Sequence, residues 1–274
     1  MSLADDGGAE RAVVQEQREE QRQEEQGGRA RERRRHHQGS GHHQPEARED
    51  QVYSMAPAAP KNPDSKLDQR AAANVFYLYN RVFLNAVIKG DLDADLQGEA
   101  TAVHREDLAG RIDYLGINYY KRPVVSGVKD PMLPSLSPLT TYDIFNVEVW
   151  NDYPRGIYEM AMVAKDYGVP VYVTENGVAD PGDDGTGGSF LVRHLTWLKR
   201  AVRDGADVRG YFWWTLTDNY EWNHGMNVRM GLYAVDATDR QKLRRARQSV
   251  GTYGQVAQAT DVPPGLAERY PTPE

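Results

Sequence analysis

The feature that most constrains the fold of this chain is a regular alternation of short apolar runs with helical segments. Three runs have the length of strands: "IDYLGINYY", "VPVYVTEN" and "VRGYFWWTL". Two helical segments separate them; the first opens at Pro154 and closes at Gly168, and the second runs from Ser189 to Gly205. This alternation predicts an α/β fold with a parallel sheet. Strands that are apolar almost throughout are typical of a sheet covered on both faces.

Two more helices are predicted outside this pattern. Upstream, apolar residues recur at helical spacing from Val75 to Val87, and Gly90 ends the segment. Downstream, "KLRRARQSVGTYGQVAQ" (residues 242–258) is predicted to form the last helix.

Polar residues lie where each of the three runs ends. The first run ends in Asn118 and Tyr120, the second reaches Glu175, and the third leads into a polar segment between Trp214 and Trp222. The carboxyl ends of parallel strands meet at one edge of a sheet, where such folds carry their chemistry. Glu175 alone would be a weak signal, because most strand-end glutamates are solvated and the Asn-Gly after it is a common turn. Three strands that share the pattern predict a single site.

The first 50 residues differ from the rest of the chain. They contain no Ile, Phe, Tyr, Trp or Lys, so they cannot bury enough apolar surface to offset their conformational entropy. We expect a disordered tail over residues 1–50, either genuine or translated out of frame, before a folded part over residues 51–274. Its histidine pairs, His36-His37 and His42-His43, could bind metal weakly. Nothing fixes their geometry, so no metal site is predicted.

Composition narrows the classes of function. The chain has no cysteine, which excludes disulfides, thiolate zinc sites and cysteine nucleophiles. The net charge of -7 argues against a nucleic-acid-binding surface. No apolar run approaches the length of a membrane span, and no secretory signal is recognised at the start. We therefore expect a cytoplasmic protein with no nucleic-acid partner, no membrane association and no cofactor.

The residues that follow the third run point to carbohydrate. Indole faces pack against the C–H faces of sugar rings, and carboxylates accept hydrogen bonds from sugar hydroxyls. Trp214, Glu221 and Trp222 supply both kinds of group within nine residues. Trp213 is equally consistent with the core, because strand alternation points it away from Trp214.

Three motifs in this order, "LGINYY", "YVTENG" and "WTLTDNYEW", resemble the last three strands of family 1 glycoside hydrolases, the retaining β-glucosidases and β-galactosidases. "GADVRGYFWWTLTDNYEW", followed by "GMNVRMGL", resembles the archaeal β-glycosidase branch. The resemblance covers about Val52 to Ala257. It implies the C-terminal portion of a (β/α)8 TIM barrel, about strands six to eight, with "VYSMAP" as the tail of strand five.

The resemblance implies a catalytic role for Glu175 as the nucleophile that attacks the anomeric carbon and forms a glycosyl-enzyme intermediate. It implies that Tyr120 donates a hydrogen bond to this carboxylate, and that Asn118 binds substrate beside it. A donated hydroxyl would favour the ionised carboxylate that a nucleophile requires.

The same resemblance assigns the sugar-binding residues. Trp214 corresponds to the platform under the sugar, and Glu221 and Trp222 correspond to the pair that binds hydroxyls far from the bond that is cleaved. A carboxylate at Glu221 would repel phosphate, so an unphosphorylated β-linked glucoside or galactoside is expected. Met230 departs from the family, which usually has Phe there; Met is a tolerable filler.

One family motif is missing, the Asn-Glu-Pro whose glutamate is the general acid/base; the sequence contains no "NEP". We therefore expect a truncated β-glycosidase that is inactive alone. Two alternatives stay open: a separate chain that supplies the first half of the barrel, or a non-catalytic sugar-binding or interaction module. Neither the choice between glucose and galactose nor the oligomeric state can be read from the sequence.

Overall fold

The computed structural model describes residues 50–130, 139, 141–143, 147 and 151–272. They all belong to one compact unit, residues 48–274. The expected disordered tail over residues 1–50, with its histidine pairs, lies outside the described residues except for the backbone of Asp50.

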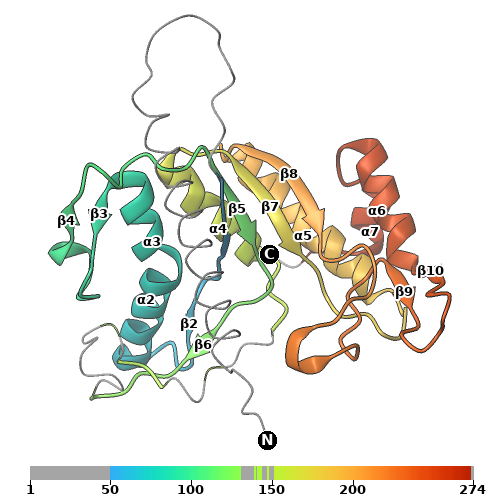
Figure 1. Ribbon diagram of the computed structural model, residues 1–274, viewed down its shortest axis with the longest axis horizontal. Helices are drawn as coiled ribbons and strands as arrows, with labels where there is room; N and C mark the ends of the chain where they lie inside the picture. The colour runs from blue at the N-terminus through green and yellow to red at the C-terminus, as the bar shows by residue number, and fades with distance from the viewer. Residues whose placement is uncertain (1–49, 131–138, 140, 144–146, 148–150, 273–274) are drawn as a thin grey trace, which may run out of the picture. The chain divides into compact units, whose positions relative to one another are not determined.

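A four-stranded parallel sheet forms the centre of this unit (Figure 1). Its order is β1-β5-β7-β8, with β1 at Asp50–Ser54, β5 at Tyr114–Asn118, β7 at Val171–Asn176 and β8 at Val208–Trp213. The three predicted runs are thus confirmed as neighbouring parallel strands. The "VYSMAP" segment contributes to a fourth strand, which pairs with β5. Within the described ranges, β1 and β8 are the two edges of the sheet.

Helices connect these strands in the predicted alternation. Between β1 and β5 lie α2 (Lys66–Asn80), α3 (Val82–Leu84) and the π-helical turn η1 (Asn85–Lys89). Helix α4 (Arg155–Tyr167) connects β5 to β7, and α5 (Thr186–Arg203) connects β7 to β8.

The predicted helix ends are confirmed where glycine ends a helix. Gly90 follows η1 with a φ of 83° and Gly168 follows α4 with a φ of 71°, both in the left-handed region that a side chain disfavours. Helix α5 starts at Thr186, three residues before the predicted Ser189.

The main core lies between the sheet and the helices α3, α4 and α5. Residues at alternate positions of β5 and β7 point into it, as the two-residue repeat of a strand requires. The fully buried members, each below 2% exposure, include Leu84, Leu115, Ile117, Tyr119, Ile157, Met160, Val171 and Val173.

The opposite face of the sheet is not covered in the described part of the chain. Val52 and Thr174 lie on this face, where both would contact a Cβ placed at Gly116. Val52 is 43% exposed, and Phe212, beside Gly210 on β8, is 55% exposed. The prediction of a sheet covered on both faces is therefore wrong for the described residues, because their helices pack on one face only. We call this second face the inner face.

The segment after β8 departs most from the prediction. It contains the 3-10 turn η4 (Trp222–His224), an antiparallel pair of β9 (Tyr233–Val235) with β10 (Arg244–Ala246), and the helices α6 (Gln248–Ala259) and α7 (Pro264–Arg269). The helix predicted over residues 242–258 is wrong in its first third. Pairing with β9 holds that part as a strand, and α7 follows what was predicted to be the last helix.

Shorter elements complete the fold. A parallel pair joins β2 (Ala59–Pro60) to β6 (Val124–Val125), and an antiparallel pair joins β3 (Asp91–Leu92) to β4 (Val103–His104), with the 3-10 turn η2 (Glu99–Thr101) between the latter two strands. None of the helices in the described ranges has the length and apolar character of a membrane span.

Candidate active site

The ends of β5 and β7 bring three of the predicted residues together. The Tyr120 hydroxyl donates a hydrogen bond of 2.6 Å to Oε2 of Glu175. Asn118 is the register partner of Glu175, at a point where the pairing of β5 with β7 becomes irregular. The Thr174 hydroxyl donates 2.7 Å to Oδ1 of Asn118 and so fixes the orientation of that amide. Glu175 itself is half-buried.

Tyr120 is held as a hydrogen-bond donor. Burial raises the pKa of its hydroxyl well above the usual value, and the hydrogen bond to Glu175 and the negative charges of Glu175 and Glu221 raise it further. The proton therefore stays on the tyrosine, and the Glu175 carboxylate stays the acceptor.

Asn176 has a structural role that the sequence reading missed. It is the last residue of β7 and is fully buried. Its amide donates 2.7 Å to the Tyr119 carbonyl and accepts 2.9 Å from the Tyr211 hydroxyl, while its own carbonyl accepts 3.0 Å from the Trp214 amide. One side chain and one carbonyl thus join the ends of β5, β7 and β8 beside Glu175.

The Asn-Gly pair does not form the turn that the sequence suggested. Neither Asn176 nor Gly177 has the positive φ that a type I′ turn needs. The glycine is required for a different reason: a Cβ at Gly177 would lie 2.0 Å from the Trp214 carbonyl oxygen. The absence of a side chain lets two strand ends approach closely beside the site.

Trp214 and Glu221 form the second part of the site. Nε1 of Trp214 donates 3.1 Å to Oε1 of Glu221, and both side chains are half-buried. The peptide bond between Trp214 and Thr215 is cis. Trp213 points the other way, as alternation predicted: it is buried edge-on against Phe190 and donates to the Met230 carbonyl.

Trp222 is the most exposed of the predicted site residues. Its side chain is 85% exposed, and its backbone has a positive φ of 46° at the start of η4. Its ring is therefore available to a ligand, but the described residues do not fix its orientation.

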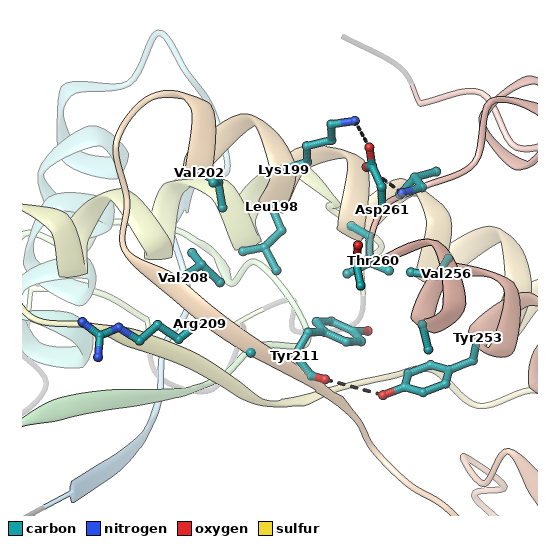
Figure 2. Close-up of a pocket in the computed structure, with 14 residues that line it drawn as sticks. Leu198, Lys199, Val202, Val208, Arg209, Tyr211, Tyr253, Val256, Thr260 and Asp261 are labelled. Atoms are coloured by element: carbon teal, nitrogen blue, oxygen red, sulfur yellow. Dashed lines mark hydrogen bonds and ion pairs between the residues drawn. The ribbon is translucent and has the colours of Figure 1, made fainter.

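Two cavities adjoin the sheet in the described part of the chain. One of about 210 Å³ lies beside Tyr120 and includes Tyr79 and Tyr142 in its lining. The other, of about 590 Å³, lies between α5, β8 and α6 on the helix-covered face, away from the Glu175 edge (Figure 2). Figure 2 shows the Lys199–Asp261 ion pair at the boundary of this second cavity.

The described residues contain no group of three or more His, Asp or Glu placed to hold a metal ion. The chemistry available at this edge is that of a hydrogen-bonded carboxylate beside an indole–carboxylate pair. Such an arrangement suits attack on, and binding of, a polyhydroxylated ring.

The chain is similar in sequence to known proteins. The family model described as Glycosyl hydrolase family 1 matches residues 28–262. A beta-galactosidase of Pyrococcus woesei is 35% identical over 219 residues, which cover 73% of this chain and 42% of that protein. A beta-galactosidase of Saccharolobus solfataricus is 38% identical over 168 residues, 56% of this chain and 32% of that protein. The chain thus spans less than half the length of these relatives.

Solved structures agree with the sequence relatives. The beta-glycosidase from Pyrococcus horikoshii superposes with a TM-score of 0.68 at 32% identity, over 81% of this chain and 51% of that one. The family 1 β-glucosidase from Thermotoga maritima gives a TM-score of 0.62 at 25% identity, over 78% and 51% of the two chains. These neighbours are TIM barrels of which this chain covers 51%, so the sheet described above corresponds to part of a (β/α)8 barrel.

Proposed function

The chain belongs to glycosyl hydrolase family 1, and on that basis we propose that it carries the nucleophile side of a retaining β-glycosidase site, with Glu175 as the attacking carboxylate. The observation that carries this proposal is the 2.6 Å hydrogen bond from Tyr120 to Glu175 at the carboxyl ends of adjacent parallel strands. In such barrels the catalytic residues come from this end of the strands. The four strands would be the fifth to the eighth of the complete barrel.

The geometry supports distinct roles for the other residues. Asn118, held by Thr174, would bind a hydroxyl next to the reacting carbon. Trp214 would place its indole under the ring, and Glu221, fixed by Trp214, would accept hydrogen bonds from hydroxyls on the far side, with Trp222 beside it. The substrate class is an unphosphorylated β-glucoside or β-galactoside, because a second carboxylate at Glu221 disfavours a phosphorylated sugar.

The proton donor would come from outside this sequence. Retaining hydrolysis uses two carboxyl groups about 5 Å apart, one to attack and one to protonate the leaving oxygen. Glu221 is committed to Trp214 and to the sugar hydroxyls, and the sequence has no Asn-Glu-Pro. Polypeptide outside this sequence that adds strands to the two open edges and covers the inner face would supply the donor. Without it, the chain would cleave ordinary glycosides poorly or not at all.

A glycoside whose leaving group needs no protonation tests the role of Glu175 as nucleophile separately from the source of the proton donor. In 2,4-dinitrophenyl 2-deoxy-2-fluoro-β-glucoside the phenolate leaves without protonation, while the fluorine slows hydrolysis of the ester formed on the enzyme. We expect the purified chain to acquire one fluoroglycosyl group, located by mass spectrometry on the peptide that contains Glu175. The galactoside version tests the sugar preference.

The matched control is Glu175→Gln, which keeps the shape and removes the nucleophile. Labelling of that variant, or of another residue in the wild type, would overturn the assignment. Saturable sugar binding without any labelling would instead favour the non-catalytic, sugar-binding module.

A further inference from the structure

The loop that carries Glu221 is held at its base by backbone hydrogen bonds. We call residues 215–230 the site loop. Thr215 exchanges hydrogen bonds with the far end of the loop: its amide donates 3.2 Å to the Met230 carbonyl, and its carbonyl accepts 2.8 Å from the Leu232 amide. The Asp218 amide donates 3.0 Å to the Tyr233 carbonyl. The loop therefore leaves and rejoins the fold at one narrow base.

A buried ion pair lies at this base. Nη1 and Nη2 of Arg247 donate 2.8 Å and 2.9 Å to the two carboxylate oxygens of Asp218, and the two side chains are only 3% and 2% exposed. Each carboxylate oxygen also accepts a backbone amide, Gly231 at 3.0 Å and Val235 at 3.2 Å. Arg247 donates in addition to the Gly231 carbonyl. Both carboxylate oxygens and both terminal guanidinium nitrogens are thus hydrogen-bonded within the protein.

The base is closely packed at Gly231. A Cβ at Gly231 would lie 2.3 Å from the Asp218 amide nitrogen and 2.5 Å from the Thr217 carbonyl carbon. The Arg247 amide donates 2.9 Å to the Leu232 carbonyl, so the arginine enters from the start of α6 at a fixed place.

We propose that Asp218 and Arg247 are positioning residues of the sugar site, which act by holding the site loop so that Glu221 meets the sugar hydroxyls. This inference rests on the proposed function of Glu221. Neither residue is placed to touch the substrate; the ion pair fixes the base from which Glu221 extends three residues later. Above the base, the Glu221 carboxylate is held by one side-chain hydrogen bond among the described contacts, which Trp214 donates. Loosening the base therefore releases Glu221 while the Tyr120–Glu175 pair stays in place.

The test is Arg247→Met, with Arg247→Lys as the conservative variant. Lysine keeps the charge but not the two-pronged geometry. The first readout is the dependence of Glu175 labelling on the concentration of the dinitrophenyl fluoroglucoside. In Arg247→Met the half-saturating concentration should rise about tenfold, the size expected for losing a hydrogen bond to a charged group. The limiting rate of labelling should stay within about threefold of wild type, because the nucleophile is untouched. Arg247→Lys should lie between the two.

The second readout does not need labelling. Hydrogen exchange should accelerate at the loop-base amides of Asp218, Gly231 and Val235 in Arg247→Met, while β5 and β7 stay protected. The matched control is Arg209→Met. It removes an arginine of β8 from its exposed ion pair with Asp207 and should change neither readout. If Arg247→Met is unfolded by circular dichroism, Asp218→Asn, which keeps the shape, takes its place.

The outcomes are distinguishable. If the wild type is not labelled, the proposed function fails, and the exchange readout still decides whether the ion pair holds the loop. Unchanged exchange at the loop base, or a fall in the limiting rate at constant half-saturation, would overturn the positioning role.

Discussion

On one side of the site, Glu175 and Tyr120 stand at the ends of adjacent paired strands, and buried Asn176 joins those ends to β8. On the other side, Glu221 lies on a loop that backbone hydrogen bonds fix at its base, and among the described contacts its carboxylate accepts one hydrogen bond, from Trp214. The first side is part of the sheet and shares its stability. The second depends on contacts between segments distant in sequence. Changes at the strand ends should therefore affect global unfolding, whereas changes on the loop above its base should affect ligand binding with little effect on unfolding.

The largest effect should come from Gly177→Ala. The added methyl would meet the Trp214 carbonyl oxygen at 2.0 Å, and this backbone atom, directly after β8, cannot move aside as a flexible side chain could. We expect a loss of about 3 kcal/mol or more in the free energy of unfolding, measured by urea denaturation. Gly254→Ala in α6 is the matched control, because nothing lies within 4 Å of its Cβ position. It should be stabilising by about 0.5 to 1 kcal/mol. Equal effects of the two variants would contradict the close approach described here.

The next largest loss of stability should come from Asn176→Ala. It leaves the Tyr119 carbonyl and the Tyr211 hydroxyl without their partner in a fully buried position. We expect a loss of about 2 kcal/mol in the free energy of unfolding. Asn227→Ala on the exposed part of the site loop should be close to neutral in the same denaturation series. If the order of the two variants were reversed, the strand ends would not be the more rigid side.

The pH dependence of the free energy of unfolding should report the ionisation of Asp218 at the base of the site loop. Burial alone would raise the pKa of Asp218, but the hydrogen bonds from Arg247, Gly231 and Val235 outweigh it and leave the pKa below its usual value. A carboxyl with a lowered folded-state pKa contributes stability that is present above its unfolded pKa, about 3.9, and is lost as the pH falls further.

The free energy of unfolding should therefore decline below pH about 4, and the decline should be shallower in Asp218→Asn, which has no carboxyl to protonate. Urea unfolding of both proteins over this pH range measures the difference. Parallel curves would show that folding does not lower the pKa of Asp218.

The smallest effect on stability should be that of Trp222→Ala. The ring is 85% exposed, so its removal should change the free energy of unfolding by less than about 0.5 kcal/mol. Binding of the fluoroglucoside should nevertheless weaken if the indole contacts the sugar. Tryptophan removal that alters neither stability nor binding would take Trp222 out of the proposed site.

The same contrast explains how much the sequence could predict. Strand alternation and the Pro154 and Gly168 boundaries depend on neighbouring residues, so β5, α4, β7 and β8 were predictable, and with them the place of Glu175 at a strand end. The strand β10 was not predictable, because it pairs with β9 across a loop within a segment of helical composition.

The role of Asn176 was also hidden. Its partners lie on two other strands, and the local Asn-Gly pattern pointed to a turn instead. The role of Arg247 was hidden for the same reason, because its partner Asp218 is 29 residues away in the sequence. The local sequence pattern identifies the residues that lie at strand ends. The residues that hold them in place can be identified only from the folded structure.

The raised pKa of Tyr120 has a consequence for rate profiles. A phenol that keeps its proton beyond the alkaline range cannot be the group whose ionisation ends activity at high pH. If this chain is completed by a partner and turns over glycosides, the alkaline limb of its pH–rate curve would belong to the partner's proton donor. That limb would then report the ionisation of the proton donor rather than that of Tyr120.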